Sequence, residues 1–421
     1  MSVDAAPHDV IGTSALQRRT LITLRVAQIP AQAAVSGVVA VVALIVSDLL
    51  DSDRLAGAGA AAFTFGAAFV AIPLSGFMRR RGRRPGLVRA FAAGSIGAFV
   101  AAFGGQIGWF PLFIVGMVAF GSGQVAGLQG RFVAADLAEP NARSVAIGSV
   151  VWVGTLGAAF GPLLTPWERR LAGAVGLEPL IGPFVFAGVF FALAAGVIAV
   201  FLRPDPLVAA GMVDPEAQRV RPVRQVRAAA AVVAARPMAQ LGLAAMVVSH
   251  TAMVAVMTMT PPHMNDHGHS NLSAYVIALH IVGMFGFSPL VGRVVERLGR
   301  PRSIMIGAVT LGAGTFISVV AGYRPVTIFV GLLLLGVGWS FGLVAGSSLL
   351  TESVPPEVRV EVQGAGDLAM SFSGGIAALS SGFIKQSFGY PTLAYAATLA
   401  AAALMVYALA RRVVRPCAPA L

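Results

Sequence analysis

Methionine and histidine side chains gather in one short stretch of the chain, between residues 246 and 284. The whole sequence has 14 methionines and 6 histidines, and six methionines and five histidines lie in this stretch. They are Met246, His250, Met253, Met257, Met259, His263, Met264, His267, His269, His280 and Met284. Thioether and imidazole groups are the soft donors that hold Cu(I), whereas hard cations prefer carboxylates. The stretch therefore predicts a binding site for a soft metal ion.

Part of the stretch has the spacing of two helical faces. The predicted ligands are Met253, Met257, His280 and Met284, with His250 as a fifth candidate. Within each apolar run they follow one another at steps of three or four residues, which places them on one face of a helix. Counting inward at about 1.5 Å per residue puts His250 and Met284 about 15–18 Å deep, near the middle of a hydrocarbon core about 30 Å thick. If the two faces turn toward each other, they form a three- or four-coordinate Cu(I) site.

Packing is the competing interpretation, because methionine often fills gaps between membrane helices. Packing is favoured for Met246 and for Met259 taken alone. Histidine favours a functional role for the set of four, because a titratable group inside an apolar span is costly and usually functional. His250 keeps three interpretations: a metal ligand, a core histidine bonded to a Ser or Thr, and a proton carrier.

The residues between the two apolar runs form an expected outer loop that carries further donors. They are His263, Met264, Asp266, His267 and His269. One hypothesis is that this loop collects the metal ion at the mouth of the pathway. Imidazole also suits Zn(II) and Ni(II), so copper is not specified by the loop alone. The alternative is a solvated loop with no role in binding.

Composition predicts an all-α integral membrane protein. Apolar residues make up 57% of the chain and charged residues 11%, far from the values of soluble proteins. Twelve apolar runs of about 20 residues are each long enough to cross a bilayer. There is no Walker loop, no nucleotide-binding glycine motif and no Ser-His-Asp constellation in a soluble domain. ATP-driven transport and enzymatic catalysis are therefore disfavoured, and no cofactor is expected.

The net charge of +12 is explained by membrane topology rather than by nucleic acid. Arginine-rich segments fall on alternate connections: residues 18–19, 79–84, 203–236, 293–302 and 411–415. The positive-inside rule places these connections and both termini in the cytoplasm, and the protein in a cytoplasmic (inner) membrane. The central arginines also suit anionic lipid headgroups. Cys417 stands alone in the predicted cytoplasmic tail and predicts no disulfide, and the first 21 residues do not resemble a signal peptide.

An internal repeat divides the chain into two halves of six spans. Asp136, Pro140 and Arg143 recur as Glu352, Pro356 and Arg359, each 216 residues later. The basic segments after the second and eighth spans agree with this offset, which indicates duplication. The predicted organisation is a cytoplasmic tail (1–21), a first half (22–202), a cytoplasmic central loop (203–236), a second half (237–411) and a cytoplasmic tail (412–421).

Charged residues near or within the spans are candidates for coupling or gating. They are Asp367, Arg25, Arg131, Glu296 and Arg300. An acid inside a span is a functional candidate, and Asp367 suits either proton coupling or a salt bridge at a gate. Arg25 and Arg131 are candidate partners for it.

Twelve spans in two six-span repeats with these loops resemble the major facilitator superfamily over nearly the whole chain. The loop signature of that superfamily is matched in the second half by Gly292, Glu296, Arg297, Gly299 and Arg300. The first half departs from it, because Ser75 replaces the first glycine and Arg79 stands where the acid belongs. The resemblance implies transport by alternating access around a midplane site between the two halves.

The Met-x-x-x-Met of the seventh span and the His-x-x-x-Met of the eighth resemble the CcoA-like copper importers, a branch of that superfamily. The resemblance implies that Met253, Met257, His280 and Met284 carry copper into the cytoplasm for cytochrome oxidase assembly. It also implies a cytosolic copper chaperone or copper ATPase as recipient. The chain is expected to act as a monomer. Two alternatives stay open: a proton-coupled carrier of riboflavin or a drug, and a copper sensor or assembly factor that does not transport.

Overall fold

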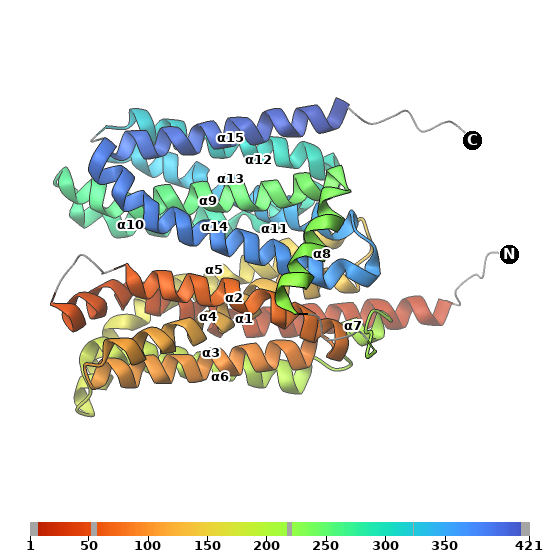
Figure 1. Cartoon of the computed structure of the whole chain (residues 1–421), viewed down its shortest axis with the longest axis horizontal. Helices are drawn as coiled ribbons and strands as arrows, with labels where there is room; N and C mark the ends of the chain where they lie inside the picture. Colours follow the sequence, from red (N-terminus) through yellow and green to blue (C-terminus); the bar gives the residue numbers. More distant parts are fainter. Residues whose placement is uncertain (1–6, 52–56, 217–220, 323, 414–421) are drawn as a thin grey trace. The chain divides into compact units, whose positions relative to one another are not determined.

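The computed structural model describes residues 7–51, 57–216, 221–322 and 324–413, and within these ranges it is helical with no β-strand. Twelve of the described helices are long and apolar enough to cross a membrane, which confirms the predicted fold class. In chain order (Figure 1) the elements are α1 (Pro7–Leu50), α2 (Ala58–Arg81), α3 (Arg83–Gln106), α4 (Phe110–Asp136), α5 (Arg143–Ala174), η2 (Pro179–Ile181), α6 (Gly182–Phe201), α7 (Pro206–Ala209), α8 (Pro222–Ala234), α9 (Pro237–Asp266), α10 (Ser270–Ile281), η3 (Val282–Gly286), α11 (Ser288–Leu298), α12 (Arg300–Val320), α13 (Pro325–Glu352), η4 (Pro356–Val358), α14 (Arg359–Phe388) and α15 (Tyr390–Val413).

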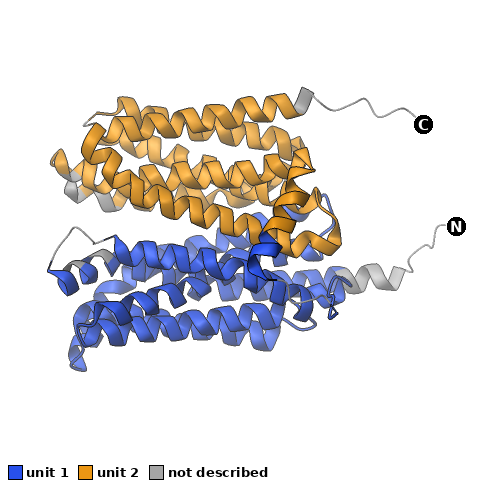
Figure 2. Cartoon of the chain, in the orientation of Figure 1, with its two compact units in different colours: residues 1–226 blue, residues 227–421 orange. Residues whose placement is uncertain are grey.

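The chain forms two compact units, Met1–Val226 and Arg227–Leu421, shown in blue and orange in Figure 2. Each unit contains six membrane spans. In unit 1, α4 packs against α2 and α3, and α1 packs against α5 and α6. In unit 2, α13 packs against α9 and α12, and α9 also lies against α14 and α15.

The same backbone turn recurs at one end of each unit, as the internal repeat predicts. Gly82 separates α2 from α3 with φ 94°, and Gly299 separates α11 from α12 with φ 83°. A positive φ is readily adopted only by glycine, so these turns require it. We call the end that carries this turn the basic end of its unit, because arginines surround it, and the opposite end the far end.

Several boundaries differ from the expected ones. The predicted tail 1–21 is helical from Pro7, and Gln17 donates from Nε2 to the carbonyl of Ala134 on α4 at 2.8 Å, so this extension has a packing partner. The predicted central loop 203–236 contains the helices α7 and α8. The predicted tail 412–421, including Cys417, lies outside the described residues beyond Val413.

The eighth span is not one continuous α-helix. It consists of α10, the five-residue π-helical turn η3 and α11. A π-helical turn inserts a residue into the α-helical ladder and often marks a functional site. Met284 is its central residue.

Candidate functional site

His280 is the most constrained of the predicted metal ligands. Its side chain on α10 is fully buried, and its Nδ1 lies 2.7 Å from the carbonyl oxygen of Leu332 on α13. A carbonyl oxygen only accepts hydrogen bonds, so Nδ1 carries the proton and Nε2 keeps its lone pair. Within the described residues Nε2 has no hydrogen-bond partner. This is the arrangement in which a second contact orients a histidine that binds metal through its other nitrogen.

Met284 lies beside His280 against the same helix. It is buried, and the backbone of α13 approaches it closely at Gly336. A Cβ atom on Gly336 would stand 2.5 Å from the carbonyl oxygen of His280 and 2.8 Å from the backbone nitrogen of Met284. Only glycine permits this approach. The backbone at His280 and Met284, the predicted pair on the eighth span, is therefore held in close contact with α13.

The predicted ligands on α9 are less uniformly buried. Met253 is buried and Met257 is half-buried. His250 accepts a hydrogen bond at Nδ1 from Trp339 Nε1 on α13 at 3.2 Å. A neutral imidazole has one acceptor nitrogen, so this bond engages the nitrogen that would bind a metal. His250 and His280 both lie within membrane spans. Of the two, His280 is the better placed metal ligand in this conformation.

The helical segments that carry the two predicted pairs both pack on α13. The helix α9 lies along α13 far more extensively than along α10, and α10 and η3 also pack on α13. Trp339 marks this arrangement, because its ring contacts His250 of α9 and lies 5.4 Å from Phe285 of η3 in a T-shaped pair. No motif or spacing in the sequence pointed to this tryptophan. Convergence of the four ligands on one ion stays a prediction.

A site with several ligands in the described part of the chain would need donors other than His, Cys, Asp and Glu alone, and methionine sulfur is one such donor. The described part of the chain contains no group of three or more His, Cys, Asp or Glu side chains that could hold a metal ion. Not every methionine is available for this role. The sulfur of Met246 accepts a hydrogen bond from the Ser347 hydroxyl at 3.8 Å, and Met259 packs against a small apolar cluster at Ala255.

Two residues of the expected outer loop are helical and buried. The helix α9 continues through Pro261 and Pro262 to Asp266, so His263 and Met264 lie in its last turns. His263 bonds through Nε2 to the carbonyl of Gly322 at 2.9 Å and stacks on Tyr390 at a centroid distance of 4.2 Å. The assignment of these two residues to a loop was wrong, because tertiary contacts hold a helix that the proline pair was expected to end.

The remaining predicted capture residues are more accessible. His267 is exposed, and its Nδ1 bonds to the carbonyl of His263 at 2.8 Å. His269 is half-buried and precedes the first residue of α10. Their role in collecting metal stays a prediction.

An exposed ion pair closes the far end of α9. Asp266 Oδ2 lies 2.5 Å from Lys385 Nζ on α14. The hydrogen bond from Lys385 holds the pKa of Asp266 below its ordinary value of 3.8. Because this folded-state pKa is lowered, the pair stabilises the protein above the ordinary value, and that stabilisation is lost as the pH falls through the lowered pKa.

Replacing Asp266 by asparagine should therefore lower the melting temperature slightly at neutral pH. The effect is small because the pair is solvent-exposed and screened. The difference from the native protein should vanish when both are melted in acid below the lowered pKa. The exposed Glu178→Gln variant of unit 1 is the control. A difference that persists unchanged in acid would show that the pair does not cause it.

Each unit also carries an ion pair at its basic end. In unit 1, Arg83 donates to both carboxylate oxygens of Asp136 at 2.8 and 3.1 Å and to Gln129 Oε1 at 3.1 Å. In unit 2, Arg300 lies 2.9 Å from both Glu296 and Glu352. The two halves therefore share one arrangement. The arginine that follows the positive-φ glycine, Arg83 or Arg300, pairs with the acid at the end of the fourth span of the same half, Asp136 or Glu352.

The first-half pair was missed because the sequence has no acid at the expected loop position. Arg79 stands there and pairs instead with Asp214 at 3.2 Å. The repeat offset that relates Asp136 to Glu352 was the signal that could have located the Arg83 pair.

The other predicted coupling residues are buried or half-buried in separate units. Asp367 is fully buried on α14 of unit 2. In unit 1, Arg131 is buried, donates to the carbonyl of Leu128 at 2.7 Å and lies over the Phe132 ring, and Arg25 is half-buried. A pairing of Asp367 with either arginine stays a prediction.

Comparison with known proteins identifies the class. The family model described as Major Facilitator Superfamily matches residues 26–378 and 271–419. The uncharacterized MFS-type transporter YddS of Bacillus subtilis is 32% identical over 380 residues, covering 90% of this chain and 87% of that protein. This chain belongs to the major facilitator superfamily, and it is a secondary transporter of that superfamily.

Two further relatives extend the comparison. The riboflavin transporter RfnT of Brucella anthropi is 27% identical over 383 residues, covering 89% of this chain and 91% of that protein. The crystal structure of the human organic anion transporter MFSD10 superposes with a TM-score of 0.77 at 16% identity, covering 93% of this chain and 99% of that chain. At that identity the likeness establishes the fold alone.

Proposed function

We propose that this transporter imports copper, as Cu(I), through a site built from Met253, Met257, His280 and Met284. The observation that carries the proposal is the fully buried His280 imidazole, whose Nδ1 is bonded to the Leu332 carbonyl and whose Nε2 has no partner among the described residues. A buried nitrogen without a partner is costly unless it serves a ligand. The neutral imidazole held in this tautomer is the form that binds a metal ion.

The neighbouring residues determine which metal ion suits the site. The buried Met284 lies one helical turn from His280, and Met253 and Met257 supply two further thioethers on α9. Thioethers bind Cu(I) and are poor ligands for Mg²⁺ or Ca²⁺. The described residues offer no carboxylate-rich group that would favour a hard cation instead. A neutral donor set of this kind also suits a monovalent ion at the middle of a membrane.

The proposed cycle places the far end of each unit outside the cell and both termini in the cytoplasm of an inner membrane. His267 and His269 would collect the ion, and the site would open alternately to the two sides of the membrane. The protein would act as a monomer with no resident cofactor, and would pass copper to a cytosolic chaperone or copper ATPase for cytochrome oxidase assembly.

A second candidate function is the transport of a small organic molecule, and it is favoured by the relation to the riboflavin transporter RfnT. This hypothesis predicts that methionine variants still transport and that Asp367 variants do not. A non-transporting copper sensor is the third candidate, and it predicts binding of copper without accumulation.

Uptake of radioactive copper into proteoliposomes under reducing conditions separates these functions. We expect the Met253→Leu/Met257→Leu and Met284→Leu variants to lose about 10- to 100-fold of their uptake at low copper concentration. Leucine conserves the volume of methionine and removes only the sulfur, so the fold should be retained. Met246→Leu is the matched control, because that sulfur accepts a hydrogen bond from Ser347.

Three outcomes would contradict the proposal. Native protein that accumulates riboflavin and no copper would establish the organic carrier. Native protein that binds copper without accumulating it would establish the sensor. Equal losses in Met246→Leu and Met284→Leu would show that the methionines act through packing.

A further inference from the structure

We infer that Glu168 is a proton-binding site through which this transporter couples its cycle to the proton gradient. Glu168 lies on α5 of unit 1 and is only 2% exposed, although it stands inside a membrane span. Its Oε2 is buried and has no hydrogen-bond partner among the described residues. The inference depends on the chain being a major facilitator transporter and not on copper being its cargo.

Glu168 packs closely on two neighbouring helices, with its carboxyl group near α1 and its backbone against the start of α6. A Cβ atom on Gly37 of α1 would stand 3.8 Å from Oε2, and one on Gly182, at the start of α6, would stand 2.3 Å from the Glu168 carbonyl oxygen. The nearby hydroxyl groups are already engaged with backbone carbonyls: Ser36 donates to Gln32 at 2.9 Å and Thr165 to Gly161 at 3.3 Å. No hydrogen bond from these hydroxyls therefore stabilises an anion at Glu168.

Charged groups on the packed elements are distant along their helices. On α1 the nearest titratable residues to Gly37 are Arg25 and Asp48, about 16–18 Å away along the helix axis. The titratable residues of α4, Arg131 and Asp136, lie at the basic end, and neither α6 nor η2 carries one. An uncompensated carboxylate is costly in such surroundings, and a bound proton removes that cost.

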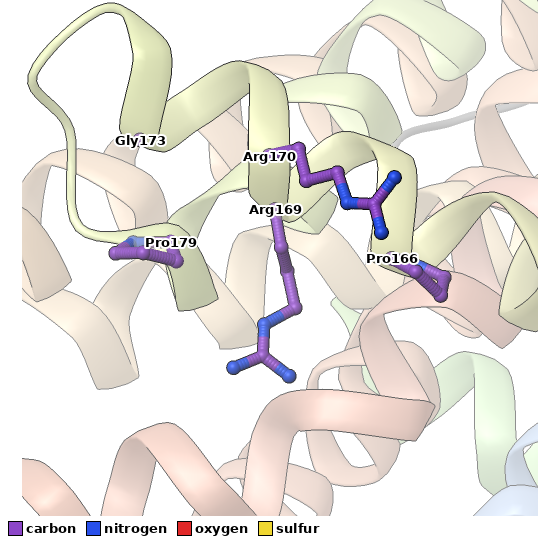
Figure 3. A pocket seen from close by; sticks show the side chains of 5 residues that line it. All are labelled: Pro166, Arg169, Arg170, Gly173 and Pro179. Carbon is purple, nitrogen blue, oxygen red and sulfur yellow. The ribbon is translucent and has the colours of Figure 1, made fainter.

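Glu168 lies near the far end of its helix, where the structure has an open pocket. Glu168 is six residues from the far end of α5, about 9 Å along the axis. At that end an open pocket of about 390 Å³ is lined by Pro166, Arg169, Arg170, Gly173 and Pro179. Figure 3 shows the two arginine side chains extending in different directions from α5. Arg169 and Arg170 directly follow Glu168 in the chain, and both are exposed to solvent.

The proposed step moves one proton with the cargo. A proton from water outside the cell bonds to a carboxylate oxygen of Glu168, and the resulting O–H bond breaks when the proton passes to water on the cytoplasmic side. Cargo binding and proton binding then strengthen each other reciprocally, by about 5- to 150-fold for a typical coupling between two sites.

Infrared difference spectroscopy of the purified full chain in nanodiscs tests proton binding without any cargo. Between alkaline and acidic buffer, the native protein should gain a carbonyl band of a protonated carboxylic acid. Glu168→Gln should lose one component of that band, and the exposed Glu178→Gln should keep it. Glu168→Asp should keep a shifted component, which guards against a misfolded glutamine variant. An unchanged band in Glu168→Gln would overturn the inference.

Proteoliposomes test the coupling itself, with Cu(I) and riboflavin as separate probes and a pH-sensitive dye inside. Native protein should acidify the lumen when it takes up its cargo. Glu168→Gln should still exchange labelled for unlabelled cargo but move no protons, because glutamine mimics the permanently protonated side chain. Equal proton movement by the native protein and the variant would overturn the inference. A failure of copper uptake alone would overturn only the proposed cargo.

Discussion

Replacing His280 by alanine should lower the affinity for Cu(I) by at least about 10- to 100-fold and abolish copper uptake at low concentration. The reason is the geometry of the imidazole. Its Nδ1 is bonded to the Leu332 carbonyl, and Nε2 is the one buried nitrogen in the site without a partner among the described residues. Removing the ring removes a fully buried ligand that the structure already holds in a metal-binding tautomer.

Competition between the purified protein and a chromophoric Cu(I) chelator measures this affinity directly. His280→Gln is the control that separates a ligand from a structural residue. The glutamine amide can still donate to the Leu332 carbonyl, but its oxygen is a poor ligand for Cu(I). Both variants should lose copper, and only alanine should lose stability as well, by about 1–3 kcal/mol for a broken buried hydrogen bond. Recovery of copper binding in His280→Gln would show that His280 acts only through the fold.

The fold was predictable because its signals are local and additive. Apolar runs of sufficient length predicted the spans, and the offset between Asp136 and Glu352 predicted the repeat. The boundaries were less predictable because they depend on tertiary contacts. The helix α9 passes Pro261 and Pro262 because His263 binds the Gly322 carbonyl and stacks on Tyr390, and neither contact is visible from neighbouring residues.

The candidate site was predictable only as faces of helices. Spacing placed His280 and Met284 on one face, but it did not show which helix that face meets. The rotation of α10 is set by the close approach of α13 at Gly336, a contact 52 residues away from Met284 in the sequence. The π-helical turn at Met284 also packs on α13, and the bond from Trp339 to His250 joins α13 to α9. These features follow from contacts between helices. The spacing of three or four residues along one helix does not determine such contacts.

Replacing Asp136 by alanine should destabilise unit 1 by about 3–5 kcal/mol, because it removes the carboxylate to which the buried Arg83 donates two hydrogen bonds. The side chains of Arg83 and Asp136 are 0% and 1% exposed. The matched change in unit 2, Glu352→Ala, should cost much less. There the partner Arg300 keeps its bond to Glu296 at 2.9 Å, and the side chains of Arg300 and Glu352 are 15% and 22% exposed. Denaturant unfolding of the purified variants, followed by circular dichroism, compares the two.

A double variant shows whether the loss of stability in Asp136→Ala comes from the buried charge of Arg83 or from the lost hydrogen bonds. A buried ion pair that is replaced by apolar residues of similar volume often leaves stability unchanged or raised, because the desolvation penalty disappears with both charges. Arg83→Met/Asp136→Leu should therefore be more stable than Asp136→Ala, although it removes more hydrogen bonds. If the double variant is the less stable of the two, the bonds of Arg83 to Asp136 and Gln129 stabilise unit 1 directly, and the pair is more than a neutralised charge.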